Sequence, residues 1–173
     1  FTKYSEKLTP EEIVKSMNFY FSKFDTIVEK YGLEKIKTIG DAYMCAGGLP
    51  FPTKDHTYKI TLAALEIAEF VKETMEINSS EKANFDIRIG INTGPVVAGV
   101  VGTIKFAYDI WGDTVNVASR MESSGEIGKV NISEETYNFL KTYKEFQFEP
   151  RGAIEAKGKG KINMYFVNKN TNN

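Results

Sequence analysis

The spacing of apolar residues predicts four helices along the chain. The first is expected to follow Thr9, because Thr9 can cap a helix at Pro10 and Glu12 completes a capping box. Apolar side chains then recur every three or four positions, which is typical of a helix with one buried face. The predicted helices cover residues 10–31, 55–75, 114–121 and 133–143.

Alternating or β-branched stretches predict strands between these helices. Two short strands are expected to flank a tight turn at Gly40-Asp41. Residues 85–91 alternate like a half-buried strand, and residues 96–101 are expected to return beside them as a second hairpin. Shorter strands are predicted at residues 129–132, 146–149, 152–156 and 161–167.

Hairpins separated by helices predict an α+β fold in which helices pack on one face of an antiparallel sheet. The ferredoxin-like arrangement is the expected form, extended by a C-terminal strand-rich subdomain. The chain has 173 residues, of which 42% are hydrophobic and 26% charged, and these values are ordinary for one globular domain. We therefore expect residues 1–173 to form a single domain.

Charge and cysteine content narrow the class of protein. A net charge of −1 offers no basic face for duplex DNA or RNA, so no nucleic-acid partner is expected. The single cysteine, Cys45, excludes an internal disulfide and fits a reducing compartment. The polar start without an initiator methionine leads us to expect a piece of a longer protein, and an upstream regulatory or membrane domain stays open as an alternative.

Three polar residues stand where chemistry is plausible. Asp41 lies at the first predicted turn, and a carboxylate is a hard ligand suited to Mg²⁺, although turns often contain Asp for backbone reasons alone. Asn116 and Arg120 are four positions apart on a predicted helix, so they share a face. An amide and a guanidinium on one face can bind a sugar oxygen and a phosphate, whereas a solvated helix face is the alternative.

Two further segments carry candidate ligands. Asp109 interrupts an apolar stretch and can accept a hydrogen bond from an exocyclic amine of a purine, or it can simply precede a helix. Lys157 begins a run of alternating Lys and Gly that resembles a cationic loop able to close over phosphates. A basic turn between two strands is the alternative for this run.

Taken in order, four stretches resemble the catalytic domain of class III nucleotidyl cyclases, of the adenylyl type. Two resemble the family's hairpins, the third its signature loop and helix, and the last its C-terminal loop. They are KIKTIGDAYM at 35–44, RIGINTGPVVAGVVG at 88–102, YDIWGDTVNVASRME at 108–122 and KGKG at 157–160. The resemblance covers essentially the whole chain, and the ordered set carries more weight than any single stretch.

The resemblance implies conversion of a nucleoside triphosphate into a 3′,5′-cyclic monophosphate and pyrophosphate, assisted by two Mg²⁺ or Mn²⁺ ions. Asp41 matches a metal-binding carboxylate of the family, and Asn116 matches the residue that orients the ribose. Arg120 matches the residue that stabilises charge on the reacting phosphate, and Lys157 the lysine that binds the outer phosphates. A cytoplasmic homodimer with shared active sites is implied, in which Asp41 comes from one subunit and the other site residues from its partner.

Base choice depends on two positions in this family. Adenylyl enzymes pair a Lys with an Asp or Thr there, whereas guanylyl enzymes typically have Glu and Cys. Lys37 and Asp109 occupy these positions, which implies ATP as the substrate. Guanine would place an oxygen against Asp109, and an unpaired buried polar group costs ~1–3 kcal/mol, enough for a preference of about ten-fold or more.

One motif is incomplete. The family's second metal carboxylate lies four residues before a Phe-Thr pair that matches Phe1-Thr2, so we expect that carboxylate to precede this chain and the chain alone to be weakly active or inactive. Three alternatives stay open: a guanylate cyclase, a catalytically silent nucleotide-binding regulatory domain, and an RNA-binding module on the same frame. The last needs an aromatic strand motif that the sequence lacks.

Overall fold

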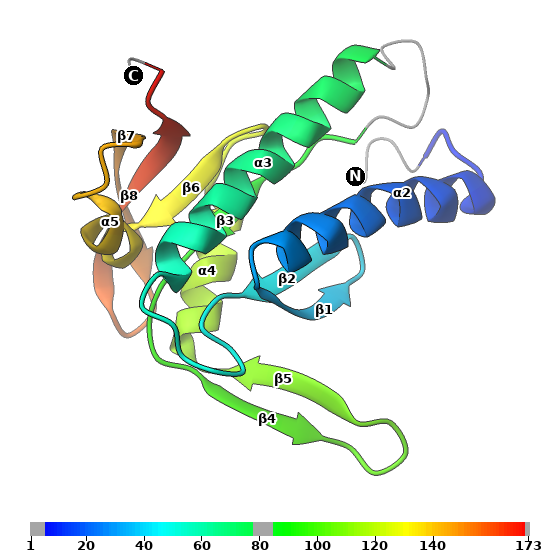
Figure 1. Ribbon diagram of the computed structural model, residues 1–173, viewed down its shortest axis with the longest axis horizontal. Helices are drawn as coiled ribbons and strands as arrows, with labels where there is room; N and C mark the ends of the chain where they lie inside the picture. Colours follow the sequence, from blue (N-terminus) through cyan, green and yellow to red (C-terminus); the bar gives the residue numbers. More distant parts are fainter. Residues whose placement is uncertain (1–5, 78–84, 172–173) are drawn as a thin grey trace.

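The computed structural model describes residues 6–77 and 85–171, and Phe1-Thr2 lie outside this range. Within it the chain forms the four helices that the apolar spacing predicts (Figure 1). They are α2 (Pro10–Lys30), α3 (His56–Ile77), α4 (Asp113–Ser123) and α5 (Glu134–Leu140). None of the helices in these two ranges has the length and apolar content needed to span a bilayer.

The strands of the described residues form three sheets. The largest has the order β3-β6-β8-β7, and the other two are the hairpins β1-β2 and β4-β5. Antiparallel pairing predominates, with one parallel pair between β3 and β6, so the predicted α+β class is confirmed. The strands are β1 (Glu34–Ile39), β2 (Ala42–Ala46), β3 (Ile89–Ile91), β4 (Val97–Val101), β5 (Ala107–Trp111), β6 (Val130–Ser133), β7 (Phe146–Ala156) and β8 (Gly160–Lys169).

The prediction for the second hairpin is wrong in its pairing. β4 pairs with β5, with Gly99 opposite Asp109, whereas the short β3 runs parallel to β6. The reason lies in tertiary packing: β3 takes β6, the strand after α4, as its partner, and α4 covers β3 so closely that a Cβ on Gly90 would stand 2.0 Å from the amide nitrogen of Glu122. A run of β-branched residues indicates a strand, but it does not specify which other strand pairs with it.

Helix α2 begins where local sequence predicts. The Glu12 amide donates to Thr9 Oγ1 at 3.2 Å, and the Thr9 amide donates to Glu12 Oε2 at 2.8 Å, which is a complete capping box. The helix ends at Lys30, and Gly32 follows with a φ of 66°, a conformation that favours glycine. This cap geometry fixes the start and end of the helix that lies over the first hairpin.

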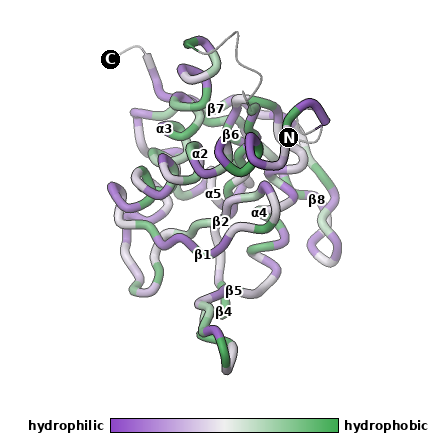
Figure 2. Tube along the Cα trace, turned by 90° about the vertical axis from the view of Figure 1, so that its right-hand side faces the viewer, coloured by the Kyte–Doolittle hydropathy of each residue, from purple (hydrophilic) through white to green (hydrophobic). Residues whose placement is uncertain are grey.

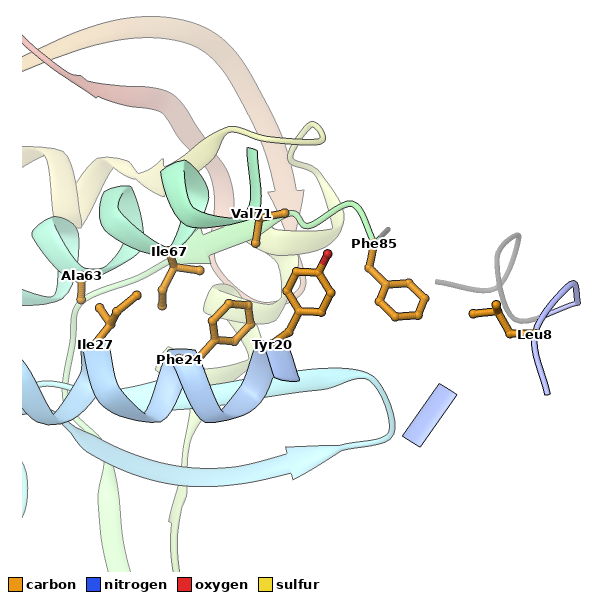
Figure 3. Close-up of a cluster of buried hydrophobic side chains, with 8 residues drawn as sticks. All are labelled: Leu8, Tyr20, Phe24, Ile27, Ala63, Ile67, Val71 and Phe85. Carbon is orange, nitrogen blue, oxygen red and sulfur yellow. The ribbon is translucent and has the colours of Figure 1, made fainter. Parts of the chain in front are cut away.

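Two hydrophobic clusters hold the helices to the sheets. In the first, side chains from α2 and α3 meet, among them Phe24, Ile27 and Ile67 (Figure 3). The second lies between α3, α5 and the four-stranded sheet and includes the fully buried Ile132 and Leu140. Fully burying one such side chain contributes ~1.5–3 kcal/mol to stability, so these clusters hold the helices firmly against the sheets.

A smaller cluster fixes α4. Val117 and Met121 of α4 pack against Met164 of β8, and Met121 is fully buried. The buried face of α4 is therefore turned to the sheet, while Asn116 and Arg120 on the same helix are exposed. This packing sets the orientation of the helix that carries two of the predicted site residues.

The β4-β5 hairpin projects away from the body of the molecule (Figures 1 and 2). Its outer part carries exposed apolar side chains, including Val101 at 58%, Ile104 at 95% and Phe106 at 78% exposure. An apolar extension of this kind is unusual on the free surface of a monomer and is typical of a contact surface.

Candidate active site

An ion pair joins two of the predicted site residues. Lys37 Nζ of β1 lies 2.8 Å from Asp109 Oδ2 of β5, although the two residues are 72 positions apart in sequence. The Ile110 amide donates to the other carboxylate oxygen, Oδ1, at 2.8 Å. The hydrogen bond from Lys37, followed by that from the Ile110 amide, lowers the pKa of Asp109 below its usual value. The carboxylate is therefore charged at neutral pH and aligned at both oxygens.

Asp41 lies in the turn between β1 and β2, as predicted. Gly40 takes a φ of 58° beside it, and the side chain of Asp41 is exposed. The turn separates Asp41 from Lys37, which lies within β1. The exposed carboxylate is accessible to a cation from solvent.

Helix α4 follows β5 with only one intervening residue. That residue is Gly112, whose φ of 135° is open to glycine but strained for other residues. The hydroxyl of Thr114 donates to the Pro95 carbonyl at 2.6 Å and anchors the first turn of the helix. This connection keeps Asp109 on β5 close in sequence and space to Asn116 on α4.

Arg120 is bound to β7 rather than free in solvent. Its Nη2 donates to the Glu155 carbonyl at 2.7 Å. Glu155 lies two residues before Lys157, the predicted phosphate-binding lysine, which is exposed at the turn between β7 and β8. The structure thus brings Arg120 close to the strand that leads into the Lys157 turn.

A second contact joins this turn to α4. Lys159 Nζ lies 2.6 Å from Asp113 Oδ2 at the first residue of the helix, and both side chains are about half exposed. Sequence reasoning missed Asp113, Lys159 and the Glu155 carbonyl. The alternating Lys-Gly run was a signal for Lys159, but nothing in the sequence identifies a main-chain acceptor.

The predicted residues therefore fall into two groups. Lys37 and Asp109 contact each other, and Asn116, Arg120 and Lys157 lie on α4 and on the turn that is bonded to α4. Asp41 stands at the hairpin turn, apart from both groups in chain position. One surface could bind a base at the first group and phosphates at the second.

One residue of the site carries a ligand suited to a hard divalent cation. Asp41 supplies a hard carboxylate of the kind that Mg²⁺ and Mn²⁺ prefer. Residues 6–77 and 85–171 contain no group of three His, Cys, Asp or Glu side chains arranged to hold a metal by themselves. The oxygen chemistry of Asp41 fits a divalent cation.

Comparison with known proteins defines the class. Residues 1–169 match the family described as the adenylate and guanylate cyclase catalytic domain. The chain belongs to this family, which generally uses divalent metal ions, and is a cyclase catalytic domain. The fold of its solved relatives is the α+β arrangement described above.

Individual relatives include both kinds of cyclase. An adenylate cyclase of Mycobacterium bovis is 40% identical over 96% of this chain and 37% of its own length. The guanylate cyclase soluble subunit beta-2 of Rattus norvegicus is 44% identical over 99% of this chain and 25% of its own length. The chain thus spans well under half the length of these relatives. Because the two kinds of cyclase are similarly identical to it, the comparison does not distinguish ATP from GTP as the substrate.

A solved structure gives the same picture. The catalytic core of a rhodopsin-guanylyl cyclase with converted specificity, in complex with ATPαS, superposes with a TM-score of 0.87. It is 37% identical, and the match covers 98% of this chain and 90% of that one. That core is described as a guanylyl cyclase bound to an ATP analogue, so the fold accepts an adenine nucleotide in at least one relative.

Proposed function

We propose that this chain is the catalytic domain of an adenylate cyclase, which converts ATP into 3′,5′-cyclic AMP and pyrophosphate. The observation that carries the proposal is the pairing of Lys37 with Asp109 at 2.8 Å. Adenine presents a ring-nitrogen acceptor beside a 6-amino donor, and this pattern complements an ammonium donor beside a carboxylate acceptor. Guanine reverses the pattern, because it presents a 6-oxo acceptor beside a ring N–H.

Both members of the pair keep capacity for the base. A lysine ammonium has three N–H donors, and one of them suffices for Asp109. The Asp109 side chain is 18% exposed, so its carboxylate is oriented yet reachable. A base that enters beside the pair can accept from Lys37 and donate to Asp109 while the ion pair persists.

The remaining residues act on the sugar and phosphates. The amide of Asn116 orients the ribose so that its 3′-oxygen faces the α-phosphorus. The reaction forms a bond between that oxygen and phosphorus, and the 3′-hydroxyl proton passes to solvent. The bond from phosphorus to the bridging oxygen breaks, and pyrophosphate leaves with its electron pair. Arg120 supports the negative charge that develops on the α-phosphate, and Lys157 holds the outer phosphates.

Divalent ions held at Asp41 and a second carboxylate would supply charge neutralisation and favour ionisation of the 3′-hydroxyl. The chain covers 37% of the length of the Mycobacterium bovis enzyme, so activity assays use the full-length protein. Asp41 holds its side chain in solvent beside Gly40, where metal and triphosphate can arrive together.

We further propose a homodimer with shared sites. Exposed apolar side chains on the β4-β5 hairpin, including Val100 at 62% and Val101 at 58%, support a partner surface. A second copy of the chain is the partner that the family resemblance implies. Asp41 of one subunit would then face the Lys37-Asp109 pair and α4 of the other.

The experiment is to identify the product. The full-length protein is incubated separately with ATP and with GTP in Mn²⁺, and the products are resolved by chromatography. Cyclic AMP with pyrophosphate is expected from ATP. The second candidate, a guanylate cyclase, is favoured by the relatives of that kind and would form cyclic GMP predominantly. A protein that binds ATP but forms neither product would be a regulatory domain.

A further inference from the structure

An irregularity in β7 lies opposite the C-terminal end of α4. β7 and β8 pair in register from Phe146 to Pro150 and again from Gly152, and the register shifts between these two positions. Arg151 is therefore the extra residue of a β-bulge, and Gly152 after it has a φ of 87°. Bulges redirect a side chain out of the regular alternation of a strand and are frequent next to active sites.

The redirected Arg151 side chain satisfies groups at the end of α4. Its Nη1 donates to the Ser124 carbonyl at 2.7 Å and to Asn131 Oδ1 at 3.2 Å. Asn131 is fully buried and in turn donates to the Met121 carbonyl at 2.9 Å. The last carbonyls of a helix lack partners within the helix, and a cation at this end also interacts favourably with the helix dipole.

Arg151 is itself firmly held. Its guanidinium carbon lies 4.0 Å from the centroid of the buried Phe166 ring. Only 17% of its side chain is exposed, and Glu126 lies at 3.7 Å as an additional partner. A planar cation that is stacked on a ring and donates to two acceptors from one nitrogen is held more firmly than a flexible surface lysine.

Ser124 connects Arg151 to the backbone of Arg120. The Ser124 amide donates to the Arg120 carbonyl at 2.9 Å, and the Ser124 carbonyl accepts from Arg151. Arg120 itself donates back to Glu155, four residues beyond Arg151 on the same strand. Helix α4 is thus attached to β7 at two points, and the strand between them leads into the Lys157 turn.

We propose that Arg151 is a positioning residue, which sets the last turn of α4 and β7 relative to each other and so places Arg120 for the α-phosphate. This inference rests on the proposed function for its kinetic consequence. The structural role of Arg151 does not rest on the proposed function, because its contacts exist in the free protein. Arg151 acts through Arg120 and touches no reacting atom.

Lys129 offers a matched control. Its Nζ also lies over Phe166, at 4.6 Å, and it forms an ion pair with Glu126 at 3.1 Å. It therefore shares two partners with Arg151, but neither of these contacts reaches α4. Lys129→Met removes a cation from the same ring and leaves the attachment of α4 in place.

The test compares Arg151→Met, Arg151→Lys and Lys129→Met in the full-length protein. For Arg151→Met, kcat should fall roughly 10–100-fold, because small misplacement of a catalytic group costs that much, with KM within about threefold. Arg151→Lys keeps the charge but not the planar guanidinium, and it should recover part of the loss. Lys129→Met should stay within about twofold of wild type.

A double-mutant cycle tests whether Arg151 acts on kcat through Arg120. In an Arg120→Ala background, Arg151→Met should lower kcat by less than about twofold, since the residue it positions is gone. The same fold-loss in both backgrounds would overturn the proposal. An equal loss of kcat from Lys129→Met would also overturn it. If Arg151→Met does not fold, Arg151→Lys alone enters the cycle with the same criterion.

A second readout does not depend on turnover. The side-chain Nε–H signal of Arg120 in an NMR spectrum should shift or broaden in Arg151→Lys and stay unchanged in Lys129→Met. An unchanged Arg120 signal in Arg151→Lys would contradict the positioning role. If the wild-type protein forms no cyclic nucleotide, the proposed function fails, and this spectrum still decides whether Arg151 positions Arg120.

Discussion

Lys37 of β1 and Asp109 of β5 form an ion pair of 2.8 Å that joins two separate hairpins. With side-chain exposures of 42% and 18%, the pair is too accessible to contribute much to stability. Its importance lies in geometry, because it places a donor and an acceptor side by side before any nucleotide arrives. Such preorganisation reduces the cost of ordering these side chains on binding.

Replacing Arg120 by Ala should lower kcat by ~10²–10³, with a smaller change in KM. The reason is that its guanidinium is proposed to meet charge that develops only in the transition state. Steady-state kinetics of the full-length variant with ATP and Mn²⁺ give both constants. A raised KM at normal kcat would instead assign Arg120 to binding of the ground state.

Shared sites predict complementation between two inactive variants. Asp41→Ala and Asn116→Ala would each disable both sites of its own homodimer. A heterodimer of the two should hold one intact site, since the defects fall together in the other site. Mixing and re-association of the full-length variants, followed by an assay of cyclic AMP, measures the recovery. Absence of recovery in heterodimers verified by mass would contradict the shared site.

Cys45 should react slowly with thiol reagents in the folded protein. Burial raises the pKa of the Cys45 thiol to about 12. At pH 8 the reactive thiolate is then about a thousandfold scarcer than in a free cysteine of pKa ~8.5. Labelling with a chromogenic disulfide should be slow in the native protein and fast in urea. Equal rates in both would show that the thiol is not buried.

The same shift gives a stability prediction with a defined sign. The folded pKa lies above the unfolded value, so the unfolded chain releases its proton first as pH rises. The fold therefore loses stability between about pH 8.5 and pH 12 through this group. Cys45→Ala should flatten the fall of the melting temperature over that window, and an unchanged profile would contradict the shifted pKa.

Local elements of the fold were predictable because their signals are local. The capping box at Thr9 and Glu12 specifies the start of α2 without any tertiary contact. The pairing of β4 was not predictable in this way, because β3 takes β6, the strand after α4 in sequence, as its partner and β4 pairs with β5. Strand partners are set by packing between segments that are distant in sequence. A periodic pattern of apolar residues gives no information on that packing.

The site shows the same division. The assignment of Lys37 and Asp109 to one base came from a family resemblance and not from spacing, since 72 positions separate them, and their contact with each other was not predicted. Arg151 was missed, although Pro150 and Gly152 on either side interrupt the strand pattern in a way that is typical of a bulge. The shorter hydrogen bond of that arginine goes to a main-chain carbonyl, and every residue has one.

The most direct test of the central claim is a competition between equimolar ATP and GTP in one reaction of the full-length protein. The account predicts that cyclic AMP exceeds cyclic GMP by about ten-fold or more, because the Lys37-Asp109 pair complements adenine. In Lys37→Glu with Asp109→Cys the ratio should move toward cyclic GMP, further than in either single variant. A wild-type ratio near one, or an unaltered ratio in a well-folded double variant, would contradict the assignment of these side chains to the base.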